Sequence, residues 1–248
     1  MTEVPTGKKT HLGFPISSKE LQKGDRRLDA SNYARESFRL RLILDSSAFP
    51  MHPITSFTEG GVPENVFNLG RFKRVWAEDS ETGYPYLSAS EILLRKPMRT
   101  RFVSKKKTEN AERFFAKEGW ILMTCSGTVG QPMIVTGKWT DYFYTHDLIR
   151  ILPKESEAGY LYAYLCSKFA QAFLTGDQYG GTVKHLEPHH VLQSIRVPAL
   201  PEDARIRIHQ MIMQAYDLRE QANQLEDHAV KELERIIEEA ALERGHTS

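Results

Sequence analysis

The sequence has little of what marks secreted and membrane proteins. Only two of its 248 residues are cysteines, Cys125 and Cys166, and both lie in apolar surroundings without the spacing of metal ligands. This pattern favours buried thiols in a reducing compartment over a disulfide framework. No stretch approaches the ~20 uninterrupted apolar residues of a spanning helix, and no apolar block follows Lys8 and Lys9. We therefore expect a cytoplasmic protein.

The signatures of common enzymes are missing too. The turn Cys125-Ser126-Gly127-Thr128 is not the G-x-S-x-G elbow of a hydrolase, and it lacks the lysine of a phosphate-binding loop. His146 and Asp147 could assist Ser126 only if the fold brought them together, and neighbours on a strand should point to opposite faces. No adenine-methyltransferase or nuclease motif is convincing. We expect no reaction centre; the competing hypothesis is a stand-alone hydrolase that uses Ser126 or the histidines described next.

A group of three histidines invites a zinc interpretation. His185, His189 and His190 lie near Glu187, but Pro188 interrupts the segment and the helical H-E-x-x-H frame is absent. The sequence therefore favours surface or helix-capping histidines over a metal site.

The net charge of +1 conceals an asymmetry between the two ends of the chain. Residues 202–248 carry six Lys/Arg and eleven Asp/Glu, which leaves 27 and 21 for residues 1–201. The strongest basic run, RKPMRTRFVSKKK at 95–107, has seven basic side chains and no acidic one. Such a run attracts a polyanion, although it also occurs as a plain solvated loop.

The pattern of apolar segments and turn residues over 1–201 predicts an α/β (α+β) domain. From Val66 to about Pro153, short apolar segments alternate with turn residues, which predicts a sheet of short strands. Helices are predicted over 28–44 and over 158–176, the second ended by Gly176. One more short strand is expected before Pro201.

The last fifth of the chain predicts a long helix of the coiled-coil type over 202–248. Its apolar residues alternate spacings of three and four: Ile208, Met211, Ala215, Leu218, Ala222, Leu225 and Ala229. With no proline or glycine between Glu202 and Arg244, the helix would extend roughly 65 Å. We expect this seam to pair with another helix; the alternative is a helix folded back on its own domain.

Three small-polar stretches, the second and third of which bear glycine, supply binding chemistry. They lie at 86–92, 125–130 and 179–186, each beside an apolar segment. Hydroxyl groups, backbone N–H groups and neighbouring basic side chains are what proteins use to hold phosphates and probe base edges. Any one of them alone is more simply a tight turn.

The order of these parts resembles the specificity subunit of type I restriction-modification enzymes. The resemblance runs from about Leu69 to Leu242 and rests on the succession GYPYLSASEI, GWILMTCSGTVG, HDLIRILP, GYLYAYLCS, YGGTVKHL and IRVPALPEDARIRIHQMI. The segment RLDASNY at 27–33 is similar to the start of such modules.

The resemblance implies a target-recognition domain, 1–201, that reads one half of a bipartite DNA sequence, and a helical spacer, 202–248. It places these residues in or beside DNA-facing loops: Ser88, Ser90, Ser126, Gly127, Thr128, Gly180, Gly181, Thr182 and Lys184. From their charge, our candidates for phosphate contact are Arg71, Lys73, Arg74, Arg95, Arg99, Arg101, Lys105, Lys106 and Lys107.

The chain departs from the usual subunit of this family, which holds two recognition domains and two spacers. This chain holds one recognition domain and one spacer, which predicts a half-subunit that pairs with its own copy or with a second half-subunit. A twofold dimer would read an inverted repeat. The resemblance further implies a partner methyltransferase subunit that binds S-adenosylmethionine and methylates adenine, with a motor-nuclease subunit in the restricting form. No cofactor is expected in this chain. A dimeric scaffold that binds no DNA is a third hypothesis.

Overall fold

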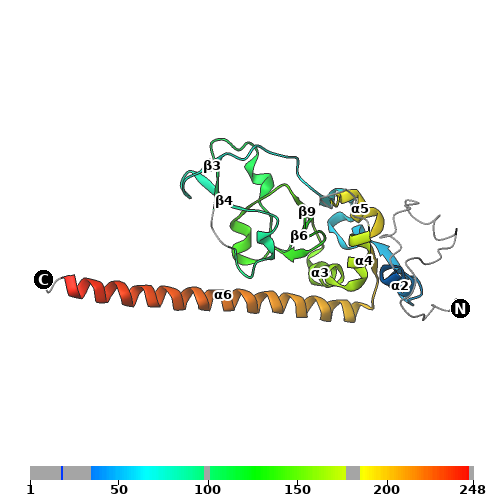
Figure 1. Cartoon of the computed structure of the whole chain (residues 1–248). Coiled ribbons are helices and arrows are strands. Elements are labelled where there is room, and N and C mark those ends of the chain that lie inside the picture. Colours follow the sequence, from blue (N-terminus) through cyan, green and yellow to red (C-terminus); the bar gives the residue numbers. More distant parts are fainter. Residues whose placement is uncertain (1–17, 19–34, 98–100, 177–184, 246–248) are drawn as a thin grey trace, which may run out of the picture.

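The computed structural model describes Ser18 and residues 35–97, 101–176 and 185–245. They form a mixed α/β domain followed by one long helix, α6 (Glu202–Gly245), which runs beneath the domain and projects past it (Figure 1). The mixed α/β class and the long C-terminal helix predicted from the sequence are therefore confirmed.

Two small four-stranded sheets carry much of the apolar core of the domain. The first sheet is antiparallel with the order β2-β9-β6-β7. Its strands are β2 (Val66–Phe67), β6 (Ile121–Thr124), β7 (Pro132–Ile134) and β9 (Leu148–Ile151). All four residues of β6 and of β9 are buried, as expected of central strands.

The second sheet has the order β3-β5-β4-β8 and contains one parallel pair. Its strands are β3 (Trp76–Ala77), β4 (Gly83–Leu87), β5 (Phe102–Ser104) and β8 (Phe143–Tyr144). Tyr86 of β4 lies opposite Phe143 of β8 in the parallel pair. A separate two-stranded sheet joins β1 (Met51–Pro53) to β10 (Arg196–Pro198), so the short strand expected before Pro201 is present.

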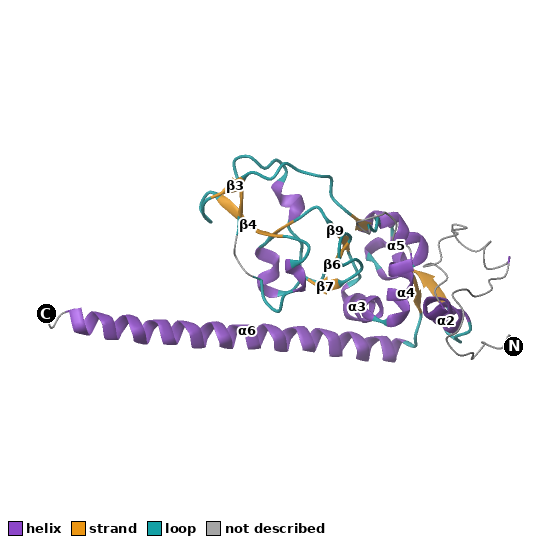
Figure 2. Cartoon of the chain, in the orientation of Figure 1, coloured by secondary structure: helices purple, strands orange, loops and turns teal. Residues whose placement is uncertain are grey.

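The α-helices of the domain gather at the end away from β3 and β4, whereas short 3₁₀ helices lie beside β4 (Figure 2). The α-helices are α2 (Arg35–Asp45), α3 (Ala158–Cys166), α4 (Lys168–Gly176) and α5 (Pro188–Ser194). The helix predicted over 28–44 is present from Arg35, and its predicted start lies outside the described residues.

The single helix predicted over 158–176 is wrong, because Ser167 divides it. Its backbone is extended (φ −69°, ψ 152°), and its hydroxyl accepts a hydrogen bond from the N–H of Ala170 at 3.4 Å. Ser167 thus caps the start of α4. Apolar periodicity continued across the break and concealed it.

Helix α5 was not predicted, although the signals for its start are present in the sequence. Pro188 occupies its first turn, and Glu187 and His190 form a capping box. The preference for a capping histidine over a metal ligand is thereby confirmed for His190.

The first part of α6 packs on the domain, and the contact is close. A Cβ atom at Gly159 of α3 would lie 2.6 Å from the carbonyl oxygen of His209, so only glycine permits this approach. Tyr216 accepts a hydrogen bond from the N–H of Ile134 on the edge strand β7 at 3.0 Å. The helix therefore covers the open edge of the first sheet.

The two cysteines differ in environment. Cys125 is buried, and burial raises the pKa of its thiol to about 11. Cys166 is exposed at the end of α3, so the expectation of two buried thiols is wrong for this one. Among the described residues, no helix is long and apolar enough to cross a membrane.

Candidate nucleic-acid interface

The turn that joins β6 to β7 has a fixed shape. The Thr124 hydroxyl accepts a hydrogen bond from the N–H of Gln131 (3.0 Å) and donates one to the carbonyl of Thr128. Gly127 and Gly130 have φ values of 74° and 82°, which glycine adopts readily. The tip of this turn, with Gly127 and Thr128, is exposed.

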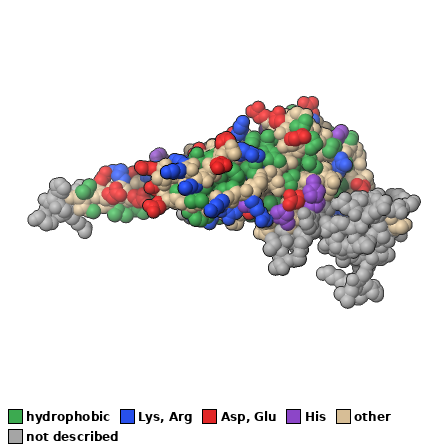
Figure 3. Space-filling model, turned by 90° about the horizontal axis from the view of Figure 1, so that it is seen from above, with side chains coloured by type: hydrophobic (Ala, Val, Ile, Leu, Met, Phe, Trp, Pro, Cys, Tyr) green, Lys and Arg blue, Asp and Glu red, His purple; other side chains and the backbone are tan. Residues whose placement is uncertain are grey.

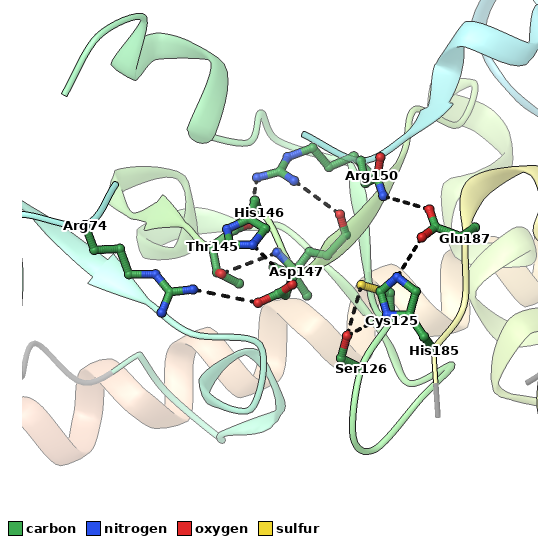
Figure 4. Close-up of polar contacts among 11 residues, drawn as sticks. Arg74, Cys125, Ser126, Thr145, His146, Asp147, Arg150, His185 and Glu187 are labelled. Carbon is green, nitrogen blue, oxygen red and sulfur yellow. Dashed lines mark hydrogen bonds and ion pairs between the residues drawn. The ribbon is translucent and has the colours of Figure 1, made fainter. Parts of the chain in front are cut away.

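A chain of hydrogen bonds ends on this turn. Ser126 Oγ lies 2.9 Å from His185 Nδ1, and His185 Nε2 lies 2.7 Å from Glu187 Oε1 (Figure 4). The amide nitrogen of Asn68 donates to the second oxygen of Glu187 at 3.2 Å. We call Ser126, His185 and Glu187 the serine relay. The sequence offered each of them as a candidate but did not reveal that they touch.

The backbone holds the two parts of the serine relay together. Ser126 and His185 pair as an isolated antiparallel bridge, and the N–H of Leu186 donates to the carbonyl of Cys125 at 2.9 Å. The order of side chains is that of a serine, a base and an orienting acid. The ring is turned, however, since Nδ1 faces the serine, whereas in serine proteases Nε2 does.

The expectation that His146 and Asp147 would point apart is wrong. His146 Nε2 lies 3.3 Å from Asp147 Oδ1, because both residues lie in the bend between β8 and β9 rather than on a strand. Asp147 also pairs with Arg74 at 3.7 Å (Figure 4). Burial lowers the pKa of His146. The base that meets Ser126 is therefore His185, not His146.

The three histidines do not form a metal site. His185 contacts Ser126 and Glu187, and His190 Nδ1 accepts a hydrogen bond from the N–H of Glu187 at 3.2 Å. The ring of His189 lies against that of His190, tilted by 41°, with centroids 3.8 Å apart. In the part of the chain that the structure describes, no group of three or more His, Cys, Asp or Glu side chains could hold a metal ion.

The basic side chains of the run at 95–107 face two different parts of the molecule. Its first residues face α6: Arg95 pairs with Glu226 at 2.8 Å, and Lys96 pairs with Asp227 at 3.0 Å. Arg101 instead lies over the ring of Tyr86, which Arg74 also covers, with distances of 5.4 and 5.8 Å to the ring centroid.

The lysines at the end of the run lie beyond β5 and are all exposed. Lys105 donates to the carbonyls of Ser80 and Glu81 at 2.9 and 3.0 Å, while Lys106 and Lys107 extend from the same turn. Arg71 and Lys73 are exposed ahead of β3. Five candidates lie outside the described residues, namely Arg99, Gly180, Gly181, Thr182 and Lys184.

Ser88 and Ser90 stand at the start of a short 3₁₀ helix, Glu91–Leu93. The backbone N–H and the hydroxyl of Ser88 both donate to Glu91 Oε2, at 2.7 and 2.5 Å. Ser90 is exposed, and its hydroxyl lies 3.4 Å from that of Ser88. The contacts of Ser88 are those of a tight turn.

Residues of the predicted seam on α6 lie in two environments. Ile208 is half-buried against the core and Ala215 is half-buried, whereas Ala222 and Ala229 are exposed. Three large seam residues are exposed by more than half, Met211 at 68%, Leu218 at 56% and Leu225 at 72%. The helix thus folds back on its own domain and still leaves an apolar stripe uncovered.

An ionic clamp closes the contact between α6 and the domain. Asp227 accepts hydrogen bonds from Lys96 (3.0 Å) and Lys138 (2.9 Å), and Asn223 donates to the carbonyl of Arg95 at 3.2 Å. From residue 228 to 242 every residue is exposed. Figure 3 shows hydrophobic side chains among acidic ones along this projecting part.

Comparison with known proteins gives one family and two similar structures. The family model of the type I restriction modification DNA specificity domain matches residues 65–227. The HsdS subunit from Thermoanaerobacter tengcongensis is similar with a TM-score of 0.47 and 12% identity, over 79% of this chain and 46% of that one. The type I restriction-modification S subunit from M. genitalium is similar with a TM-score of 0.40 and 13% identity, over 70% of this chain and 40% of that one. The chain spans less than half the length of either, and no curated protein matches it.

Proposed function

Because the chain belongs to the family of type I restriction-modification DNA specificity domains, we propose that it recognises one half of a bipartite DNA sequence and pairs through α6 with a second spacer helix. The recognition domain comprises residues 1–201 and the spacer residues 202–248. In this proposal the chain acts in the cytoplasm and contributes recognition alone.

The observation that carries the pairing is the uncovered stripe on α6. Met211, Leu218 and Leu225 recur every seven residues and remain exposed although the same helix packs on its domain. Exposed apolar stripes with this repeat are stabilised when a second helix covers them. Leu233 and Ile236 extend the apolar surface beyond the ionic clamp, where the domain no longer touches the helix.

A twofold dimer built this way would read an inverted repeat. The two recognition domains would be related by the symmetry of the helix pair, so each would meet the same half-site in opposite orientation. The gap between half-sites would be fixed by the helices. A second half-subunit with a different recognition domain would give an asymmetric target instead.

We further propose that the reaction belongs to partner subunits. A methyltransferase subunit would bind S-adenosylmethionine and methylate adenine, and a motor-nuclease subunit would join in the restricting form. The chain itself would hold no cofactor. Its exposed basic residues, among them Arg71, Lys73, Lys106 and Lys107, are the candidates for phosphate contact.

The hydrolase hypothesis has one observation in its favour, the contact between Ser126 and His185. A DNA specificity domain recognises DNA and leaves the chemistry to other subunits, so the family weighs against it. If the purified chain hydrolysed an ester and Ser126→Ala abolished that activity, the hydrolase hypothesis would replace ours.

Selection from a random duplex library tests DNA recognition. The purified chain, with and without the methyltransferase subunit, should enrich one sequence containing an interrupted repeat. A scaffold that binds no DNA would enrich nothing.

Sedimentation of the chain tests the pairing separately. We expect a dimer, or a complex with a second half-subunit, and Leu225→Glu should dissociate it because a charge would then lie in the apolar seam. Lys231→Glu is the matched control, since Lys231 is exposed on the same helix but lies on the side away from the seam. A monomer at all concentrations, alone and with candidate partners, would contradict the proposal.

A further inference from the structure

The serine relay fixes where the proton of the Ser126 hydroxyl lies. Glu187 is a carboxylate and accepts hydrogen bonds at both oxygens, one from Asn68 and one from His185. His185 must therefore carry a proton on Nε2. In the neutral ring Nδ1 then has no proton and can only accept, so the Ser126 hydroxyl donates to it across 2.9 Å.

The remaining neighbour of the Ser126 hydroxyl does not change this assignment. Cys125 Sγ lies 3.9 Å from Ser126 Oγ. The pKa of this thiol is raised to about 11 by burial, so it stays protonated near neutral pH. Because the Ser126 proton is directed to His185, the thiol can reach Ser126 Oγ only as a weak donor. A hydroxyl oxygen accepts up to two hydrogen bonds, and Ser126 Oγ therefore keeps at least one lone pair free of Cys125.

The position of Ser126 makes this lone pair available to a ligand. The residue is half-buried beside the exposed Gly127 and Thr128, at the tip of the turn that Thr124 holds in shape. Gln171 also fixes the turn, because its side-chain nitrogen donates to the carbonyl of Gly130 at 2.8 Å. A hydroxyl held in this way loses little freedom when it meets a partner.

We propose that Ser126 is a specificity-determining residue that accepts a hydrogen bond from an exocyclic amine of the target DNA. The inference rests on the proposed function and deepens it. In the major groove only adenine N6 and cytosine N4 donate, while guanine and thymine present acceptors at the corresponding positions. Ser126 therefore selects adenine or cytosine at one position of the half-site. His185 and Glu187 are positioning residues, because they act through Ser126.

The test begins with the sequence that the wild-type chain selects, measured at pH 8. Selection is repeated with Ser126→Ala, and the one position that becomes less specific is identified. The amine at that position is then removed chemically, by replacing adenine with purine or cytosine with 2-pyrimidinone. Removal should weaken binding of the wild type about three- to tenfold, the range of one net hydrogen bond, and should leave binding of Ser126→Ala unchanged.

Two further variants separate a specific contact from a change in the turn. Thr128→Ala removes a hydroxyl from the same turn and should keep the wild-type response to loss of the amine. His185→Gln leaves no ring nitrogen to hold the Ser126 proton, so the hydroxyl can donate, and guanine or thymine should become tolerated at that position. Thermal unfolding of each variant shows that it is folded.

The outcomes distinguish this inference from the proposed function. If the wild type selects a sequence and Ser126→Ala selects it with the same preferences, the inference is wrong and the proposed function stands. Equal loss of binding by wild type and Ser126→Ala when the amine is removed would also overturn the inference. If no sequence is selected, both fail.

Discussion

At the scale of single residues, buried polar groups set the shape of the recognition domain. The side chain of Arg150 is fully buried in β9 and donates to the carbonyls of Thr145 and Leu148, at 3.3 Å each. Burial lowers its pKa to about 10. These two hydrogen bonds hold the bend that carries His146 and Asp147. The sequence shows Arg150 only as one basic residue in an apolar strand.

Tyr216 gives a prediction at the same scale. Its hydroxyl accepts a hydrogen bond from the backbone N–H of Ile134. This N–H lies on the outer side of the edge strand β7, where no described strand supplies an acceptor. Tyr216→Phe should lower the free energy of unfolding by about 1–3 kcal/mol, because it leaves this donor without its acceptor. Urea unfolding measures the change. Tyr84→Phe, on a half-exposed ring, is the control and should change stability little.

The individual residues of the site could be found in the sequence, but their contacts could not. Ser126 and Glu187 attract attention as polar residues beside Gly127 and Pro188, and His185 as one of three clustered histidines. Ser126 and His185 lie 59 positions apart in the sequence and give no local signal of contact, because the bridge between them depends on how α3 and α4 return the chain to β6. The contact between the adjacent residues His146 and Asp147 differs from the expectation for a local reason, since they form a bend and not a strand.

At the scale of elements, the packing of α3 against α6 depends on one glycine. Gly159→Ala would place a Cβ atom against the backbone of His209, and neither helix can yield at that point. We expect the free energy of unfolding to fall by about 1–3 kcal/mol, the usual cost of overpacking. Gly70→Ala is the matched control, because a Cβ atom there would meet nothing within 4 Å. Equal stability of the two variants would show that α6 is not held as described.

The ionic clamp predicts a dependence on pH. Hydrogen bonds from Lys138 and then Lys96 lower the pKa of Asp227 to about 2. Since the pKa is lower in the folded chain than in the unfolded one, the stabilisation is complete above about pH 4 and is lost as the pH falls towards 2. The free energies of unfolding of the wild type and Asp227→Asn should therefore differ at pH 7 and converge near pH 2. Glu234→Gln, on the projecting part of α6, should show no such convergence.

The sequence predicted elements well where the pattern was long and poorly where a break was short. The seven-residue repeat of α6 has no proline or glycine to interrupt it, and the helix is continuous over Glu202–Gly245. The division between α3 and α4 depends on the backbone conformation of one residue, Ser167. A serine does not by itself predict the end of a helix, because many serines lie elsewhere. The inward face of α6 was also missed, because Tyr216 and Asn223 lie off the apolar seam.

At the scale of the whole molecule, binding to DNA should depend on salt through the exposed lysines after β5. Lys106→Gln should weaken binding to all duplexes alike and flatten the slope of log K against log salt by about 0.9, since one phosphate contact would be lost. Titrations at several salt concentrations measure this slope. Lys231→Gln on α6 should leave it unchanged. A loss of sequence preference in Lys106→Gln would instead assign this residue to base recognition.

The overall architecture was predictable because charge and periodicity divide the chain in the same place. The basic front and the acidic tail meet near Pro201, where α6 begins. The sequence could not show that part of this charge difference is used internally. Arg95, a candidate for phosphate contact, pairs with Glu226, and its neighbour Lys96 pairs with Asp227, so both join the domain to its own long helix.

The exposed end of α6 also bears on the lifetime of the chain. Beyond Asp227, 18 residues of helix extend about 27 Å with no support from the domain. A lone helix of this length is only marginally stable in water, so a protease would meet it unwound and cut it there. Such a cut would remove Leu233 and Ile236 from the proposed pairing surface, and it would spare the core together with Met211, Leu218 and Leu225. A second helix that covered this end would slow the cut, so unpaired copies should be shortened faster than paired ones.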